Sequence, residues 1–211
     1  MTGQYLKKIG LVSFLLCVCI PAYAQQKDTS SEKDTPLGVQ SYALPKLSHT
    51  YSEKFCGFEI KFPSEPTITD ITSPDTPDLQ ATSISFLKIY DIDKSVRVTA
   101  NCKQINKDIR IFINETSIEQ ELEAIIQDKN IKLTAKSSTA RPEERLRIGS
   151  LSGQRATTPN QGIYIYQLWV ADTSIFTLEA EVTGPEYPDA DKLLVSILQS
   201  FHRTPAEITA P

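Results

Sequence analysis

Apolar and polar residues alternate along much of the chain after residue 50, which is typical of β-strands with one buried face. Clusters of Pro, Gly, Asn and Asp interrupt this pattern and predict turns between the strands. A short apolar run at 109–113 is either another strand or the start of a helix. The predicted strands are 51–55, 57–62, 67–72, 81–90, 95–105, 131–136, 147–157, 163–170 and 174–183.

Two segments instead place apolar residues three or four positions apart, which predicts amphipathic helices. The first is expected to begin with a capping box, formed either by Thr116 with Glu119 or by Ser117 with Gln120. The second is expected to begin after Pro188. Their apolar stripes are Ile118, Leu122, Ile125 and Ile126, and Leu193, Leu194, Ile197, Leu198 and Phe201.

The segment 163–170 decides the architecture, because both faces of this predicted strand are apolar. One face carries Ile163, Ile165, Gln167 and Trp169, and the other carries Tyr164, Tyr166, Leu168 and Val170. A strand with two apolar faces must be covered on both sides. We therefore expect an α+β fold, an α/β/α sandwich in which two amphipathic helices cover a central antiparallel sheet, one on each face.

Two stretches resemble a known family. FCGFEIKFPSEP opens the predicted domain, and GIYIYQLWVADTSIFTLEAEV is followed by a break and a helix that closes on ILQSFH. Over residues 50–203 the chain resembles PsbP-like and DcrB-like domains, which end in three strands and a helix with a Ser-Phe pair, here Ser200-Phe201. The resemblance implies a non-catalytic module that docks on other proteins or at a membrane surface. The chain departs from the family in its Cys56/Cys102 pair and in lacking a lipid-attachment cysteine.

Residues 1–24 have the layout of a secretory signal peptide. Lys7 and Lys8 precede a run of 12 mostly apolar residues, and the segment Ala22-Tyr23-Ala24 offers a cleavage site before Gln25. A membrane anchor is the alternative, but 12 helical residues span only about 18 Å against a bilayer core of about 30 Å. We therefore expect a periplasmic or secreted protein with no transmembrane segment after cleavage.

The remaining chain divides by composition. Residues 25–48 are polar and lack apolar periodicity, so we expect a flexible tether. The folded PsbP-like domain is expected at 49–203, followed by a C-terminal tail at 204–211.

Charge and composition exclude several activities. The chain has 22 Lys and Arg against 26 Asp and Glu, a net charge of −4, which excludes general nucleic-acid binding through a basic face. Its two histidines, His49 and His202, make a histidine-built metal site unexpected. No spaced nucleophile, base and orienting group is visible, so we expect no catalytic residues, no cofactor and no enzymatic activity.

Cys56 and Cys102 are the cysteines that remain after the leader. Alternation places Cys56 on one face with Phe58, Ile60 and Phe62, and Cys102 on another with Val96, Val98 and Ala100. Both thiols should point toward the core, and an exported chain favours a disulfide between them. Two buried free thiols are the alternative.

Two short motifs have structural explanations. Asn114-Glu115-Thr116 matches a glycosylation acceptor, but it lies where a helix cap is needed, and we prefer the cap. Gly149 and Gly153 lie in a predicted strand, where they indicate a bend or close packing.

Two groups of residues are candidates for binding. Tyr164, Tyr166 and Trp169 either line a ligand pocket or belong to the core. The mixed-charge cluster before the last three strands is either a solvated surface or the rim of a partner-docking site. It consists of Glu143, Glu144, Arg145 and Arg147.

These observations favour an exported, non-catalytic accessory or binding module that docks on an unknown envelope protein or membrane-associated assembly. An inhibitor or immunity-type partner of an exported enzyme is the alternative, and a hydrolase with scattered carboxylates is less favoured. The sequence leaves the partner, the ligand and the oligomeric state open.

Overall fold

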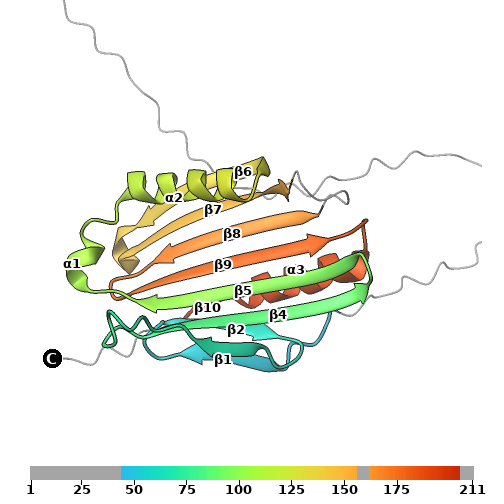
Figure 1. Cartoon of the computed structure of the whole chain (residues 1–211), viewed down its shortest axis with the longest axis horizontal. Helices are drawn as coiled ribbons and strands as arrows, with labels where there is room; N and C mark the ends of the chain where they lie inside the picture. The colour runs from blue at the N-terminus through green and yellow to red at the C-terminus, as the bar shows by residue number, and fades with distance from the viewer. Residues whose placement is uncertain (1–43, 156–161, 205–211) are drawn as a thin grey trace, which may run out of the picture. The chain divides into compact units, whose positions relative to one another are not determined.

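A computed structural model describes residues 44–155 and 162–204 of the chain. Within them, a seven-stranded antiparallel sheet has the order β3-β4-β5-β9-β8-β7-β6, and a three-stranded sheet has the order β1-β2-β10 (Figure 1). The strands are β1 (His49–Glu53), β2 (Phe58–Phe62), β3 (Thr67–Asp70), β4 (Ala81–Asp91), β5 (Lys94–Gln104), β6 (Ile131–Arg141), β7 (Leu146–Arg155), β8 (Ile163–Val170), β9 (Ser174–Thr183) and β10 (His202–Arg203). The helices are α1 (Lys107–Arg110), α2 (Glu115–Asp128), the 3-10 turn η1 (Pro142–Glu144) and α3 (Pro188–Ser200).

Helix α2 covers one face of the large sheet, over β6 and β7 (Figure 1). Its Ile118 and Leu122 are fully buried, while Ile125 and Ile126 are partly buried. They pack into one core cluster with the tyrosine face of β8. The β8 residues of this cluster are Tyr164, Tyr166, Leu168 and Val170.

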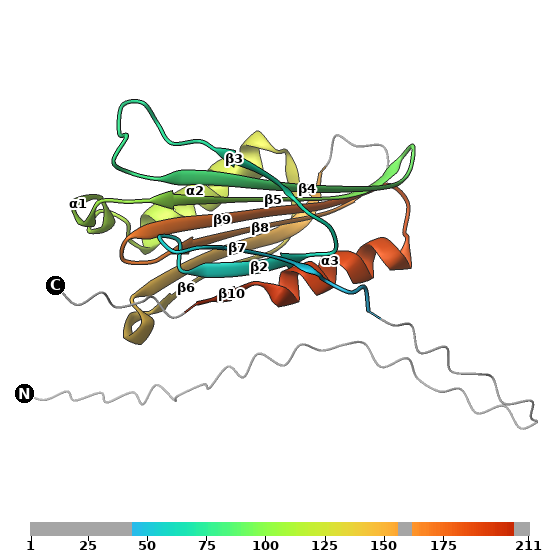
Figure 2. The same ribbon diagram turned by 90° about the horizontal axis from the view of Figure 1, so that it is seen from below.

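The opposite face of the large sheet is covered by α3 together with the three-stranded sheet (Figure 2). The α+β class is therefore confirmed, and so is the expectation that β8 needs cover on both faces. The prediction that one helix covers each face does not hold for this second face, because β2 of the small sheet covers it together with α3. The Ser200-Phe201 pair connects the end of α3 to β2. The Lys61 N–H donates to the Ser200 hydroxyl at 2.9 Å, and Phe201 packs against Phe58.

The predicted capping boxes of the first helix are both wrong, because the N-cap of α2 lies two or three residues before the predicted Thr116 or Ser117. Asn114 is its N-cap: its side-chain oxygen accepts from the Ser117 N–H at 3.0 Å, and the Ser117 hydroxyl accepts from the Asn114 N–H at 2.9 Å. A capping box thus forms with Ser at its third position instead of Glu or Gln. The Asn114 side chain has the capping role that we preferred for it.

Several boundaries differ from the prediction. The run at 109–113 is not a strand, because its first two residues belong to the short helix α1. Asn106 caps this helix, and its side chain accepts from the Asp108 N–H at 3.1 Å. β6 extends five residues beyond the predicted 136, and β10 was not predicted. At the start, Leu47 packs on the core and the Ser48 N–H donates to the Phe62 carbonyl, so the fold begins just before residue 49.

The remaining domain assignments fall largely on residues that the structure does not describe. The predicted signal peptide, the tether up to residue 43 and the tail from residue 205 lie outside the described ranges.

Cys56 and Cys102 form the predicted disulfide, and both are buried. Their Cα atoms lie 5.9 Å apart, within the range that a disulfide requires. Cys56 lies in the turn between β1 and β2 and not on a strand, whereas Cys102 lies in β5. The bond therefore links the turn of the small sheet to β5, an inner strand of the large sheet. The buried Ser174 hydroxyl adds a hydrogen bond to the Cys56 carbonyl at 2.9 Å.

Gly149 confirms the expectation of close packing. A Cβ at this position of β7 would lie 2.6 Å from Cγ2 of Ile118 on α2, which is closer than two carbons can approach. The absence of a side chain at this position thus sets how closely α2 lies on the sheet.

We expect Gly149→Val to lower the free energy of unfolding by about 1–3 kcal/mol, because α2 must move away from β7. Urea denaturation followed by circular dichroism measures this change. Thr139→Val, at an exposed position of the neighbouring strand β6, is the matched control and should change stability by less than about 0.5 kcal/mol. A Gly149→Val variant as stable as the parent would show that α2 adapts freely.

Candidate functional site

Tyr164 and Tyr166 belong to the core and not to a ligand pocket. They are 0% and 5% exposed, on the face of β8 that lies under α2. Burial raises the pKa of both hydroxyls. The carboxylate of Glu179 raises the pKa of Tyr164 further, and those of Glu121 and Glu179 raise the pKa of Tyr166, so both tyrosines stay neutral. Of the two interpretations that the sequence left open for them, the structure supports the core.

Trp169 faces the other side of β8 and belongs to an aromatic cluster. Its ring lies 4.9 Å from that of Phe201 and 6.0 Å from that of Phe58, both edge-on. Its indole N–H donates to the Gln167 side chain at 3.3 Å. Trp169 is only partly buried, but its contacts are those of a packing residue.

A charged cluster that the sequence did not indicate lies next to Tyr164. The Arg155 guanidinium lies 3.1 Å from Glu179 and 3.2 Å from Glu181, and it is 5.2 Å from the centre of the Tyr164 ring. Arg155 therefore neutralises much of the charge of two half-buried carboxylates. This arrangement explains why acidic residues are tolerated on the α2 side of β9.

The mixed-charge cluster lies at the end of the large sheet where β7 begins and β8 ends. Glu143 and Glu144 form η1, and Arg145 follows in the left-handed conformation, with φ of 49°. Arg145 is 78% exposed in its side chain and pairs with Asp172 at 3.1 Å. Such an exposed pair contributes at most about 1 kcal/mol to stability, so these charges are available to a partner.

The segment 105–113 carries an exposed apolar tip at the same end of the sheet. Ile109 is 48% exposed, and Ile111 and Phe112 are each 74% exposed. We call these three residues the α1 tip. The apolar run at 109–113 does not reveal this exposure by itself, because apolar residues are usually buried. The available signal is the spacing in DIRIFI, where Arg110 lies among the apolar residues.

The α1 tip is held firmly to the domain. Ile105 is buried and its N–H donates to the Thr173 carbonyl at 2.8 Å, while Ile113 packs against the core under α2. Between them, Arg110 donates from Nε to the Ala171 carbonyl at 3.0 Å and from a terminal nitrogen to the Ile113 carbonyl at 3.2 Å. The segment is thus attached before, within and after the exposed residues.

The α1 tip and the mixed-charge cluster meet at the turn between β8 and β9. Arg110 binds this turn through Ala171, and Arg145 binds it through Asp172. Burial, and then the nearby charge of Arg147, lowers the pKa of Arg110. One end of the domain therefore presents exposed apolar side chains beside several arginines.

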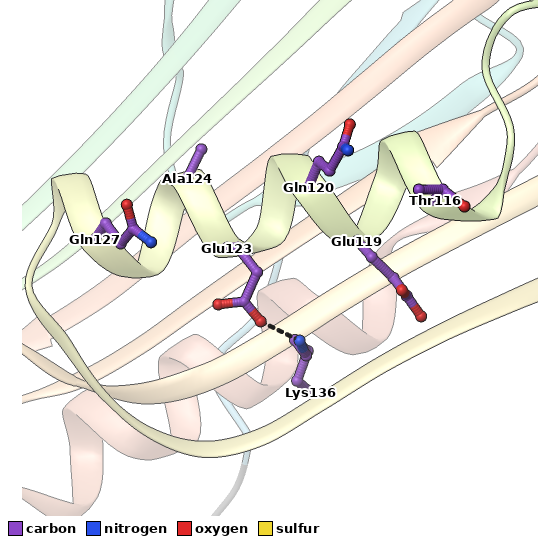
Figure 3. Close-up of a pocket in the computed structure, with 7 residues that line it drawn as sticks. All are labelled: Thr116, Glu119, Gln120, Glu123, Ala124, Gln127 and Lys136. Atoms are coloured by element: carbon purple, nitrogen blue, oxygen red, sulfur yellow. Dashed lines mark hydrogen bonds and ion pairs between the residues drawn. The ribbon is translucent and has the colours of Figure 1, made fainter.

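A shallow groove of about 380 Å³ runs along α2 and β6 (Figure 3). Lys136 of β6 forms an ion pair with Glu123 of α2 inside it. Every side chain that lines it is exposed and most are polar, unlike the largely apolar lining typical of ligand pockets. Its lining residues are Thr116, Glu119, Gln120, Glu123, Ala124, Gln127 and Lys136.

Within residues 44–155 and 162–204, no group of three or more His, Cys, Asp or Glu side chains is placed to hold a metal ion. His49 and His202 lie at different positions along β2, opposite Phe62 and Glu59. In the same described part of the chain, no helix has the length and apolar character needed to cross a membrane.

No protein-family model matches the chain, and no curated protein matches it. Among solved structures, cyanobacterial PsbP (CyanoP) from Synechocystis sp. PCC 6803 is similar at 14% identity and a TM-score of 0.47, over 80% of this chain and 99% of that one. LpqN, a protein involved in cell envelope biogenesis of Mycobacterium tuberculosis, is similar at 12% identity and a TM-score of 0.36, over 68% of this chain and 86% of that one. A PsbP structure is thus among these neighbours. At these identities the likeness assigns no activity, ligand or partner.

Proposed function

We propose that this chain is an exported, non-catalytic accessory module that docks on an envelope protein or a membrane-associated assembly. The docking surface is the end of the domain that carries the α1 tip and the mixed-charge cluster. The observation that carries the proposal is the α1 tip itself, three exposed apolar side chains within four residues on a firmly attached segment. Contiguous exposed apolar residues with a polar rim are typical of interaction sites.

Two further features support an exported module. The signal-peptide layout of residues 1–24 and the buried Cys56–Cys102 disulfide both fit an oxidising compartment. Residues 25–48 are polar and lack apolar periodicity, and they would act as a tether between the export site and the domain. The periplasm or the cell exterior is the proposed location.

A photo-cross-linking residue at Asp108, next to the α1 tip, tests the docking surface in cells. We expect an adduct with an envelope component from position 108 and none from the control position Ile92, which is fully exposed in the β4–β5 turn. Absence of an adduct at 108, or equal adducts at both positions, would contradict docking through this end.

The identity of the adduct also separates the alternative function. An inhibitor or immunity-type protein would be cross-linked to an exported enzyme, whose activity would fall when the purified chain is added. An accessory module would be cross-linked to a membrane-associated component, with no such loss.

A further inference from the structure

The α1 tip is placed to enter a surface, because its strongly exposed residues lie at one end of the domain. Both views show α1 at the extreme end of the large sheet, beyond the ends of β5 and β9 (Figures 1 and 2). Ile111 and Phe112 directly follow this helix, and each is 74% exposed. A protein partner would need a matching pocket to bury these apolar side chains, whereas a lipid bilayer accepts them without one.

Hydrogen bonds hold the segment 105–113 in one conformation before it binds anything. The Arg110 side chain donates hydrogen bonds to two carbonyls, and the capping box of Asn114 and Ser117 fixes the backbone directly after the tip. Little conformational freedom therefore remains to be lost when the tip binds. Because the attachments do not use the Ile111 and Phe112 side chains, these remain available.

The charge around the α1 tip differs in sign from that of the whole chain. The three segments that meet here, 105–113, 141–147 and 171–173, carry five basic and four acidic side chains, a net charge of +1, although the chain has a net charge of −4. This local excess of positive charge matches an anionic surface. The basic residues are Lys107, Arg110, Arg141, Arg145 and Arg147, and the acidic residues are Asp108, Glu143, Glu144 and Asp172.

We propose that the α1 tip binds the surface of an anionic lipid bilayer, with Ile109, Ile111 and Phe112 entering the headgroup and acyl boundary. Lys107 and Arg145, both exposed, contact lipid phosphates beside them. Apolar insertion and attraction to anionic lipid together set the strength of such interfacial binding. This inference rests on the proposed function and names the surface on which the module docks.

Flotation with vesicles tests the inference, using residues 25–211 because the apolar leader would itself bind lipid. We expect binding to vesicles of phosphatidylglycerol and phosphatidylcholine, and at least tenfold weaker binding to phosphatidylcholine alone, because five basic side chains, among them the exposed Lys107 and Arg145, lie at this end. The double variant Ile111→Ser/Phe112→Ser should bind the anionic vesicles at least tenfold more weakly.

The matched control removes exposed apolar residues elsewhere. Leu87 and Ile89 on β4 are 49% and 63% exposed, and the double variant Leu87→Ser/Ile89→Ser should bind as the parent does. Lys107→Gln and Arg145→Gln should each weaken binding to anionic vesicles about fivefold and leave binding to phosphatidylcholine unchanged. Circular dichroism establishes that every variant is folded.

Two outcomes would overturn the inference: no binding to anionic vesicles, or binding that the tip variant and the β4 variant weaken equally. If vesicles are not bound but position 108 is cross-linked to an envelope protein, the lipid inference fails and the proposed docking function stands. If neither is observed, both fail.

Discussion

Replacing both Cys56 and Cys102 with alanine should lower the free energy of unfolding by about 4 kcal/mol. The bond closes a loop with a sequence separation of 46, and losing it restores that conformational freedom to the unfolded chain. For a domain with a total stability of about 5–15 kcal/mol, this is a large share. Urea denaturation of the parent and of the double variant measures the change.

The double serine variant should be less stable than the double alanine variant by a further 1–3 kcal/mol or so. Cys56 is 2% exposed and Cys102 is fully buried, so each serine would carry a hydroxyl into an apolar site. The difference between the two variants isolates this polar cost from the effect of the cross-link. A melting temperature that reductant leaves unchanged would contradict the stabilising role of the bond.

The layers of the fold were most predictable where the alternation of a strand or the three-to-four-residue spacing of a helix was strong. β8 has apolar residues on both faces, and this pattern alone required cover on each side of the sheet. The apolar stripes of α2 and α3 then predicted two amphipathic helices, each with one face to pack on the sheet. The cysteine pairing was predictable for a similar reason. Alternation places Cys102 on the buried face of β5, and Cys56 lies two residues before the buried Phe58 of β2.

Elements that depend on distant contacts were not predictable in the same way. β10 has only two residues, and it exists because β2 offers them a pairing edge. β6 is an edge strand with almost all of its side chains exposed, so it has no apolar alternation to reveal its last five residues. The three-stranded sheet shares a face with α3 because of packing between segments far apart in the chain.

The candidate site was predicted only in part. The arginines and glutamates at 143–147 were recognised as a mixed-charge cluster, but their neighbours were not, because 105–113 and 171–173 are brought to them by the fold. Apolar residues in the α1 tip resembled core residues by type. Only their exposure in the folded chain distinguishes Phe112 from a buried phenylalanine such as Phe58.

Phe58→Ala and Phe112→Ala make the same chemical change but should therefore affect different properties. Phe58→Ala should lower the stability of the domain, and Phe112→Ala should weaken its binding to anionic vesicles. Phe58 is 1% exposed on β2, and its ring lies 5.0 Å from that of Phe176 and 5.6 Å from that of Phe201. It joins the small sheet to β9 and to the end of α3. We expect Phe58→Ala to cost about 3–5 kcal/mol, from lost burial and from the cavity left between these elements.

Phe112→Ala is the matched control, because its ring is 74% exposed and little burial is lost. Its free energy of unfolding should change by less than about 0.5 kcal/mol, while binding to anionic vesicles falls at least about tenfold. Urea denaturation and vesicle flotation on the same two proteins separate the roles. If Phe112→Ala proved as destabilising as Phe58→Ala, the α1 tip would be part of the core in solution and not available to a membrane.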